Sequence, residues 1–417
     1  MLYKISKPTK DLKGTIHVPF SKSESNRLLI IKALCNDSFE IKNLSDSDDT
    51  LTLHKILQSE TRNPESEIVH DVGNAGTTMR FLTAYFATQP GTRILTGTER
   101  MKQRPIKILV DALKTLGAKI EYLEKPGFPP LKIEGTNFKG GEITIEGNES
   151  SQYISALLLI APSLPEGLTI NFSGKLTSRP YIRMTLKMME KFGIEYLDNR
   201  DKIVFLPQKY QPVNQGMGCE VEADWSSASY WYAMAALSKD TDLKLVGLKK
   251  NSLQGDSIIT DMFTLFGVKT EYLEDGVRLT KLRKKVYEFV FDFSDCPDIA
   301  QTIAVVTAAL KIPCLLNGLH TLKIKETDRV LALCQEMAKV GVKINQYNES
   351  LEIPMSYIFH PPASGISTYN DHRMAMAFAP LALMFDKIKI ENPEVVTKSY
   401  PHFWDDMKAV GFEITGE

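Results

Sequence analysis

The chain has 417 residues, of which 43% are hydrophobic and 24% are charged, enough for two or three domains with sizeable cores. Lys and Arg total 50 against 51 Asp and Glu, a net charge of -1, which removes bulk electrostatic attraction as an argument for a nucleic-acid or anionic-membrane partner. Residues 1–10 lack an apolar stretch, and the longest apolar run, residues 375–385, is too short to span a bilayer. We therefore expect a soluble cytoplasmic protein in which any anion site is local.

Cysteine and histidine give no sign of a disulfide framework or a metal site. The cysteines are an odd number without a C-x-x-C pair: Cys35, Cys219, Cys296, Cys314 and Cys334. The seven histidines lack paired metal-ligand spacing. We expect buried free thiols, no metal and no cofactor.

One pattern occurs five times along the chain: the end of an amphipathic helix, a glycine and a short strand. The glycines are Gly117, Gly193, Gly267, Gly341 and Gly411, separated by 76, 74, 74 and 70 residues. This period is too long for a solenoid unit but fits a βαβαββ module with two helices. Each glycine stands where a helix ends and a positive φ is wanted. Residues 51–57 are helical in pattern and indicate a sixth copy without the glycine.

Six such modules fill the chain and split into two groups of three, so we predict an α/β fold of two similar lobes. Residues 150–164, 297–310 and 371–385 are apolar nearly all round, which is typical of buried helices. Each lobe should therefore hold its helices inside and show its sheets outside. We expect residues 21–222 to form one lobe and residues 1–20 with 223–417 to form the other, with a cleft between them.

Polar residues gather at the N-terminal ends of apolar segments, where free backbone N–H groups and the helix dipole favour anions. Residues 20–34 open with Lys22, Ser23, Ser25, Asn26 and Arg27 ahead of an apolar helix. Residues 71–87 place Gly73, Asn74, Gly76, Thr77 and Thr78 at a predicted helix start, where glycine lets the backbone approach a ligand closely. Alone, this glycine pattern is equally typical of a structural turn.

A basic run without an interleaved acid follows, formed by Arg100, Lys102, Arg104 and Lys107. A solvated helix face is the usual explanation of such a run. Here the run leads through Pro105, a good first helical residue, into an apolar helix. We therefore expect Arg104 at the helix entry.

Residues 325–333 carry a second basic pattern, in which Lys325 and Arg329 lie one turn apart and repel unless an anion or the acids Glu326 and Asp328 intervene. A capping arrangement around Thr327 explains part of it. The order of cation, acid and cation at a helix start also suits an anion site with a proton donor beside it.

Residues 369–373 and 397–401 add one cation each. Seven cations thus stand out in a chain of almost no net charge: Lys22, Arg27, Arg104, Lys325, Arg329, Arg373 and Lys398. If they converge, the ligand is polyanionic. Asp298 and Glu326 are the candidate acid–base partners, with pKa values set by these cations.

Ten motifs, in this order along residues 14–410, resemble those of the EPSP synthase (3-phosphoshikimate 1-carboxyvinyltransferase) family: SKSESNR, GNAGTTMRFLTA, RMKQRPIKILVDAL, SSQYISALL, SRPYIRMTL, EADWSSASYW, PDIAQTIA, KETDR, YNDHRMAMAF and TKSYP. The resemblance implies transfer of the enolpyruvyl group of phosphoenolpyruvate to the 5-hydroxyl of shikimate 3-phosphate, with release of phosphate, on the route to aromatic amino acids. It also implies two lobes of three βαβαββ units each. The expected partners are these small-molecule substrates alone, bound by a monomer.

Carried over residue by residue, the resemblance implies two sets of substrate contacts. Shikimate 3-phosphate would contact Lys22, Ser23, Arg27, Ser150, Ser151, Gln152, Ser178, Asp298 and Lys325. Phosphoenolpyruvate would contact Lys22, Gly76, Arg104, Gln152, Arg329, Arg373 and Lys398. Asp298 would take the hydroxyl proton and Glu326 would protonate the vinyl carbon, with Lys22 as the third catalytic residue and Tyr181 and Asn74 as neighbours.

Three residues depart from the family pattern without removing a charge. Phe20 stands where a glycine is usual, Phe81 where proline is common, and Thr321 where some members have an asparagine that contacts substrate.

Two alternatives stay open. A UDP-N-acetylglucosamine enolpyruvyl transferase shares the architecture and the donor, but that family has a reactive cysteine in a loop whose counterpart, near residues 100–107, contains none here. A non-catalytic phosphometabolite-binding protein would keep the fold and the cations, yet would be expected to lose Asp298 or Glu326.

Overall fold

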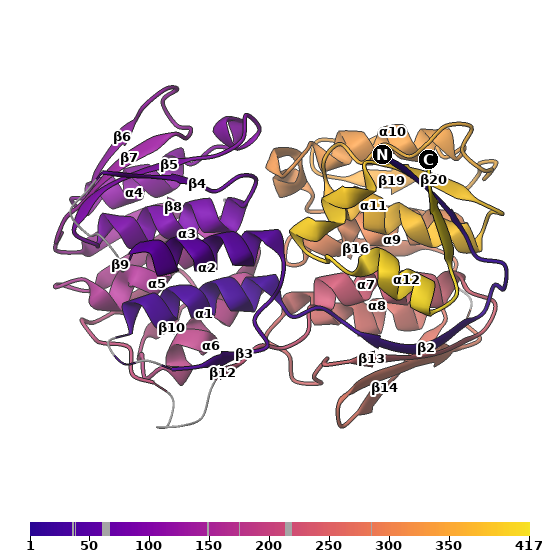
Figure 1. Ribbon diagram of the computed structural model, residues 1–417, viewed down its shortest axis with the longest axis horizontal. Coiled ribbons are helices and arrows are strands. Elements are labelled where there is room, and N and C mark those ends of the chain that lie inside the picture. The colour runs from indigo at the N-terminus through magenta and orange to yellow at the C-terminus, as the bar shows by residue number, and fades with distance from the viewer. Residues whose placement is uncertain are drawn as a thin grey trace. The chain divides into compact units, whose positions relative to one another are not determined.

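The computed structural model describes residues 1–417 apart from 36, 38, 61–66, 148, 149, 175, 213–218 and 285. The chain forms two compact units, drawn in Figure 1. Unit 1 consists of Met1–Ser21 and Glu222–Glu417, and unit 2 of Lys22–Val221. From the sequence we placed the two crossings one residue away, after residues 20 and 222. No helix in the described part of the chain is long and apolar enough to cross a lipid bilayer.

Unit 2 alternates helices with short strands. Its helices are α1 (Lys22–Leu34), α2 (Asp48–Glu60), α3 (Gly76–Ala87), α4 (Lys107–Thr115), α5 (Ser151–Ile160) and α6 (Arg179–Lys191), with 3₁₀ turns η1 (Met101–Gln103) and η2 (Ala161–Ser163). Its strands are β3 (Ile41–Lys42), β4 (Ile68–Asp71), β5 (Gly91–Thr96), β6 (Lys119–Tyr122), β7 (Leu131–Gly135), β8 (Gly141–Glu146), β9 (Leu168–Ser173), β10 (Leu197–Asn199), β11 (Lys202–Phe205) and β12 (Cys219–Glu220).

Unit 1 repeats this alternation. Its helices are α7 (Trp225–Leu237), α8 (Ile259–Leu265), α9 (Ala300–Ala309), α10 (Arg329–Lys339), α11 (His372–Phe378) and α12 (Phe403–Ala409), with 3₁₀ turns η3 (Gly255–Ile258), η4 (Pro297–Ile299), η5 (His320–Ile324), η6 (Ala379–Leu383) and η7 (Pro393–Lys398). Its strands are β1 (Leu2–Ser6), β2 (Leu12–His17), β13 (Thr241–Val246), β14 (Val268–Leu273), β15 (Gly276–Lys281), β16 (Phe289–Asp292), β17 (Cys314–Asn317), β18 (Asn345–Gln346), β19 (Leu351–Ile353), β20 (Ile388–Glu391) and β21 (Glu413–Gly416).

Four of the sheets share one topology: a parallel pair of strands is extended by two antiparallel strands. The strand orders are β6-β7-β5-β4, β10-β11-β9-β8, β14-β15-β13-β2 and β18-β19-β17-β16. A fifth sheet, β21-β1-β20, follows the same plan with the N-terminal strand β1 as the inserted strand and Ile366 bridging Ile390 in parallel. The parallel pair β3 and β12 is the reduced sixth. The predicted fold of two similar α/β units with three repeats each is confirmed.

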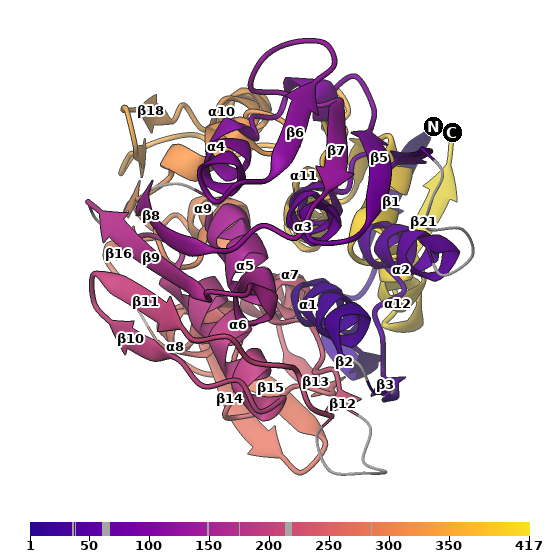
Figure 2. The same ribbon diagram turned by 90° about the vertical axis from the view of Figure 1, so that its left-hand side faces the viewer.

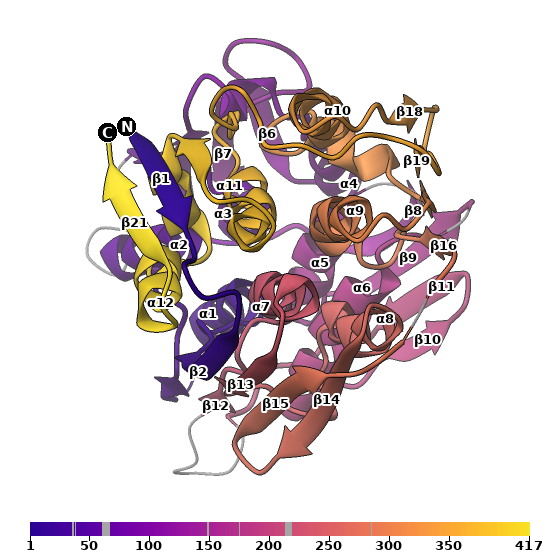
Figure 3. The same cartoon turned by 90° about the vertical axis from the view of Figure 1, so that its right-hand side faces the viewer.

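The helices lie inside each unit and the sheets outside, as Figure 2 shows for unit 2 and Figure 3 for unit 1. All of α9 and α11 is buried, as are residues 153–160 of α5, so the prediction of three buried apolar segments is confirmed. The strands alternate accordingly: in β8, Ile143 and Ile145 are buried while Glu142, Thr144 and Glu146 are exposed. Because the outer sheet faces are polar and solvated, we look for the functional site at the starts of the helices.

The repeat glycines have the predicted conformation. Gly117, Gly193, Gly267, Gly341 and Gly411 have φ values of 103°, 78°, 82°, 83° and 88°. Each stands two residues after the last helical residue of α4, α6, α8, α10 or α12. These helices therefore end on a left-handed residue that turns the chain into the next strand.

The cysteines are all free thiols. Cys296 and Cys314 are buried as predicted, and burial raises the pKa of both, that of Cys314 to about 11. The other three, Cys35, Cys219 and Cys334, are only half-buried, so the prediction of burial is wrong for them.

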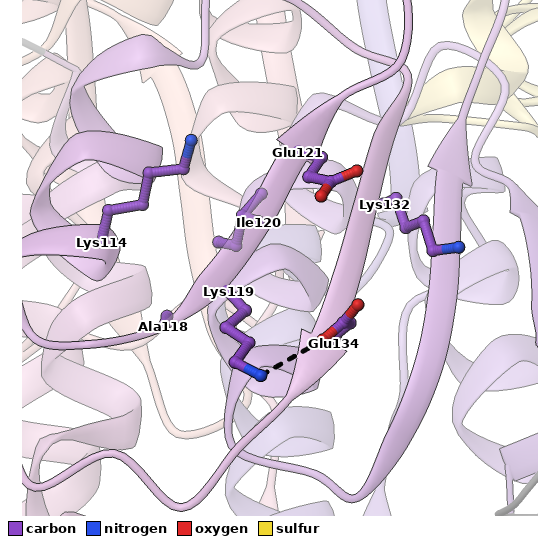
Figure 4. Close-up of a pocket in the computed structure, with 7 residues that line it drawn as sticks. All are labelled: Lys114, Ala118, Lys119, Ile120, Glu121, Lys132 and Glu134. Carbon is purple, nitrogen blue, oxygen red and sulfur yellow. Dashed lines mark ion pairs between the residues drawn. The ribbon is translucent and has the colours of Figure 1, made fainter.

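A hollow of about 270 Å³ on unit 2 is shown in Figure 4. It is lined by Lys114, Ala118, Lys119, Ile120, Glu121, Lys132 and Glu134. Lys119 pairs with Glu134 at 3.6 Å, and Lys132 pairs with Glu67 at 2.8 Å. None of the candidate site residues lines this hollow, and its paired charges mark a solvated sheet face.

Two of the repeat glycines separate the cost of backbone strain at a positive φ from the cost of a steric clash of the added Cβ. A Cβ at Gly193 meets no atom closer than 3.7 Å, whereas one at Gly341 collides with the carbonyl oxygen of Ile358. We expect Gly193→Ala to lower the free energy of unfolding by about 1–2 kcal/mol through strained φ alone. Gly341→Ala should cost clearly more in the same urea titration. Equal losses would contradict the close approach of Ile358.

Candidate active site

The candidate residues fall into two groups, one in each unit. The group in unit 1 comprises Asp298, Lys325, Glu326, Arg329, Arg373 and Lys398. The group in unit 2 comprises Lys22, Ser23, Arg27, Gly76, Arg104, Ser150, Ser151, Gln152 and Ser178. Each group is described by itself.

In unit 1 the starts of three packed helices bring the candidates together. Helices α9, α10 and α11 contact one another, and η7 packs against α11. Asp298 lies in η4 directly before α9, Arg329 is the first residue of α10, and Arg373 is the second residue of α11. Lys398 ends η7. The helix starts that the sequence singled out therefore meet at one place.

Asp298 is bound by cations from three segments. Its Oδ1 lies 3.2 Å from Nη1 of Arg329 and 3.7 Å from Nζ of Lys325, and its Oδ2 lies 2.8 Å from Nη2 of Arg373. The side chain is 19% exposed. The carboxylate is thus oriented by its partners while remaining open to a ligand.

Glu326 is held in the same way by two cations. Its Oε1 lies 2.7 Å from Nζ of Lys398, and its Oε2 lies 2.8 Å from Nη2 of Arg329. Both proposed proton-transfer groups are therefore joined through the guanidinium of Arg329. That cations set the pKa values of Asp298 and Glu326 stays a prediction.

A third carboxylate, Asp371, completes the network and was missed in the sequence. It is fully buried, and its Oδ2 accepts from Nε of Arg329 at 2.7 Å. Its Oδ1 caps α11 by accepting from the backbone N–H of Arg373 at 2.9 Å. Burial lowers the pKa of Arg329, but the surrounding carboxylates, Asp371 foremost, raise it well above its ordinary value. An aspartate directly before an apolar helix was the available signal.

Two expectations about this segment are corrected. The cap of α10 is Asp328, whose Oδ1 accepts from the N–H of Leu331 at 3.0 Å, rather than Thr327. The side chains of Lys325 and Arg329 do not face each other as an unrelieved pair, because both contact Asp298. An acid therefore relieves the repulsion, but the acid that contacts both cations is Asp298, which was not one of the two acids named from the sequence.

Asp256 in η3 lies close to this network. Its side chain is buried, one oxygen accepts from the hydroxyl of Ser226, and Oδ1 finds no hydrogen-bond partner among the residues that the structure describes. Burial and the charge of Asp298 raise its pKa to about 7, while Ser226 and Arg373 act in the opposite direction. Asp256 is therefore largely protonated below neutral pH.

In unit 2, Arg27 is buried among neutral acceptors. Its guanidinium donates to Thr185 Oγ1 at 2.7 Å, to the carbonyl of Ser23 at 2.8 Å, to Ser155 Oγ at 3.1 Å and to the carbonyl of Tyr181 at 3.3 Å. Burial lowers its pKa to about 10. These contacts fix the guanidinium without neutralising it, as an anion-binding arginine requires.

Lys22 begins α1, and its Nζ lies 3.6 Å from Oδ2 of Asp49 in the first turn of α2. The backbone carbonyl of Asp49 accepts from the hydroxyl of Thr78 in α3 at 2.9 Å. The starts of these three helices are tied together in this way, and Asp49 is a further residue that the sequence did not point to.

Gly76 and Arg104 lie against each other. Gly76 begins α3, and a Cβ there would lie 2.6 Å from Nη1 and 2.8 Å from Nη2 of Arg104. Arg80 supports both segments by donating to the carbonyls of Gly76 and Pro105, at 3.2 and 2.8 Å. Pro105 precedes the N-cap Ile106, so its expected place as the first helical residue is wrong. A side chain at position 76 would therefore displace the Arg104 guanidinium from its place in this structure.

The serines occupy two further helix starts. Ser150 caps α5, where its Oγ accepts from the N–H of Gln152 at 3.3 Å, and the Gln152 amide donates to Thr77 Oγ1 at 3.3 Å. Ser178, the N-cap of α6, has a left-handed φ of 54°. Strain of this kind at a residue other than glycine is typical of functional positions.

Each departure from the family pattern has a definite structural setting. Phe20 forms an isolated antiparallel bridge with Ala223. The Phe81 ring lies under the Arg27 guanidinium, 5.5 Å from Cζ to the ring centroid. Thr321 is buried, and within the described part of the chain its hydroxyl has no hydrogen-bond partner. Phe81 thus gives Arg27 a face that proline lacks.

Comparison with known proteins places this geometry in context. The profile of the EPSP synthase (3-phosphoshikimate 1-carboxyvinyltransferase) family matches residues 6–61 and 58–407. A 3-phosphoshikimate 1-carboxyvinyltransferase of Bacteroides fragilis is 49% identical over 416 residues, covering 99% of each chain. One from Sulfurovum sp. is 39% identical over 428 residues, covering 97% of this chain and 98% of that protein. The structure of EPSP synthase from Acinetobacter baumannii aligns over 100% of both chains with a TM-score of 0.79 at 21% identity, which shows the fold.

The raised pKa of Asp256 predicts a pH-dependent stability. Between its ordinary value of 3.8 and about 7, the unfolded chain loses this proton while the folded chain retains it, so the free energy of unfolding falls as pH rises. Asp256→Asn removes the titration, and relative to wild type it should gain at least about 1 kcal/mol between about pH 4 and pH 8. Urea titrations at several pH values measure this gain. Asp261→Asn, at an exposed site in α8, is the control, and a flat difference for Asp256→Asn would contradict the shift.

Proposed function

The chain belongs to the EPSP synthase family, and we propose that its two groups of candidate residues serve the same two substrates. The reaction is transfer of the enolpyruvyl group of phosphoenolpyruvate to the 5-hydroxyl of shikimate 3-phosphate, which yields 5-enolpyruvylshikimate 3-phosphate and phosphate. The enzyme acts as a monomer in the cytoplasm and needs no partner beyond these small molecules.

The substrates carry negatively charged phosphate and carboxylate groups, and the positively charged side chains of the candidate site are complementary to them. In unit 2, Arg27 with Ser23, Ser150, Ser151 and Ser178 takes the acceptor. Lys22 and Gln152 reach both substrates, and Gly76 and Arg104 take the donor. In unit 1, Lys325 joins the acceptor contacts, and Arg329, Arg373 and Lys398 join the donor contacts. These assignments rest on the family resemblance and on the cations found at these positions, of which Lys22 and Lys325 are half-buried and the arginines and Lys398 are buried.

The proton transfers are assigned to the two linked carboxylates. Asp298 takes the proton of the acceptor hydroxyl as its oxygen bonds to C2 of the donor, and Glu326 delivers a proton to the vinyl carbon. The resulting methyl group then loses a proton to Glu326 as the C2–O bond to phosphate breaks, which forms the C=C bond of the enol ether product. The proton held by Asp298 leaves with the released phosphate or to solvent, so both carboxyl groups regain their starting states. Lys22, whose side chain is 17% exposed, stabilises charge that develops on the donor.

The observation that carries this proposal is the shared guanidinium of Arg329, which contacts Asp298 at 3.2 Å and Glu326 at 2.8 Å. Because one planar guanidinium holds both carboxylates, they are placed to act as the base and the acid on a single adduct. A phosphometabolite-binding protein has no need of this pair.

The direct test measures phosphate released from phosphoenolpyruvate with each acceptor. We expect release with shikimate 3-phosphate and none with UDP-N-acetylglucosamine. Release with the UDP sugar alone would replace the proposed acceptor, and release with neither would favour a binding protein.

Glu326→Gln tests the proton role. The amide cannot donate or accept the proton, so kcat should fall by roughly 10² to 10⁴ while calorimetric affinity for shikimate 3-phosphate changes little. The matched control is Glu336→Gln, a buried glutamate in α10 that accepts from the N–H of Ser367 at 3.0 Å. If the Glu326 variant keeps its turnover, another residue is the acid.

Gly76→Ala tests the donor site through the close approach of Arg104. The added methyl displaces the guanidinium, and the herbicide glyphosate, a longer competitor of phosphoenolpyruvate, should lose more affinity than the compact donor. We expect the inhibition constant to rise far more than the donor KM, with the acceptor KM hardly moved. Gly416→Ala, where a Cβ meets no atom closer than 3.9 Å and the backbone has no left-handed φ, is the control. Equal effects on inhibitor and donor would show that the donor is placed wrongly.

A further inference from the structure

Tyr230 is a buried residue of α7 that reaches the unit 1 network. Its side chain is 1% exposed, and its hydroxyl oxygen accepts from Nη1 of Arg373 at 3.2 Å. The ring packs edge-on against Phe403, with centroids 5.9 Å apart and an interplanar angle of 73°. Within an apolar helix this tyrosine looks like core, yet its polar end is directed at a candidate substrate-binding arginine.

The hydrogen bond fixes one side of the Arg373 guanidinium. Nη2 of the same group lies 2.8 Å from Asp298, and the backbone N–H of Arg373 is bound by Asp371. Contacts on both terminal nitrogens, one from Asp298 and one from Tyr230, define the plane of the guanidinium. Tyr230 therefore contributes to the direction in which the other N–H groups point.

The support beneath Tyr230 is itself rigid. The N-cap Asp224 accepts from the N–H of Ser227 at 2.7 Å, and Trp231 Nε1 donates to the Tyr400 hydroxyl at 3.0 Å. Burial raises the pKa of Tyr230 to about 12, although Arg373 lowers it in part, so the side chain stays a neutral phenol. A neutral oxygen orients the arginine without cancelling its charge.

We propose that Tyr230 is a positioning residue for donor binding, because its hydroxyl holds the Arg373 guanidinium in the orientation that receives phosphoenolpyruvate. This inference rests on the donor role of Arg373 in the proposed function. It predicts a loss of donor affinity with no loss of acceptor affinity, which damage to the fold would not produce.

Tyr230→Phe removes the hydroxyl and keeps the ring in place. We expect KM for phosphoenolpyruvate to rise roughly tenfold, the scale of one hydrogen bond to a charged group, and KM for shikimate 3-phosphate to stay within about twofold. The matched control is Tyr232→Phe in the same helix, which deletes a hydroxyl bonded to Thr270 at 3.0 Å and should leave both constants unchanged. Thermal unfolding midpoints confirm that both variants are folded.

A double-mutant cycle with Arg373→Lys completes the test. If Tyr230 acts through Arg373, adding Tyr230→Phe to the lysine variant raises the donor KM far less than in wild type. Additive effects, an unchanged donor KM in Tyr230→Phe, or an equal loss in Tyr232→Phe would overturn the inference. Those results leave the proposed function intact, because that function fails only if the wild-type protein releases no phosphate with shikimate 3-phosphate.

Discussion

The Arg329 side chain is only 2% exposed, and its guanidinium contacts three carboxylates from three segments of unit 1. Asp371 precedes α11, Glu326 precedes α10, and Asp298 precedes α9. Burying a charge costs several kcal/mol unless charge-assisted hydrogen bonds replace its hydration. Because the guanidinium needs these partners, the three segments are held to each other. The starts of α9, α10 and α11 are therefore linked through one side chain.

The fork of Arg329 also sets the spacing of the proposed acid and base. Nη1 faces Asp298 and Nη2 faces Glu326, while Nε is used by Asp371. A planar guanidinium has five N–H groups in fixed directions, so the two carboxylates cannot drift independently. A lysine offers one charged centre and no such fork. The arrangement requires arginine for its geometry as much as for its charge.

Features that depend on neighbouring residues could be predicted from the sequence, whereas features that depend on contacts between distant segments could not. The helix ends at Gly193 and Gly411 follow from local backbone preference, so their spacing was readable and gave the repeat. Asp371 and Tyr230 were missed because an N-cap aspartate and a core tyrosine have ordinary local explanations, and their roles come from partners far along the chain. The cap at Asp328 was placed one residue early, since adjacent threonine and aspartate are both good caps. Which carboxylate each cation contacts, such as Asp298 for Arg373, also could not be predicted, because such pairs join segments far apart in the sequence.

The two buried arginines show how charge is divided between holding the site and binding a ligand. Arg329 is already satisfied by carboxylates, so a ligand adds little to it beyond a remaining N–H group. Arg27, in contrast, is surrounded by hydroxyls, carbonyls and the ring of Phe81, and burial lowers its pKa to about 10. No ion pair with a carboxylate is found for it among the described residues. A dianionic ligand would supply that missing countercharge, and its binding would recover the desolvation cost that folding imposes on Arg27. The charge of Glu24 acts on Arg27 from a distance, but no carboxylate among the described residues pairs with its guanidinium, which therefore suits the phosphate of the acceptor.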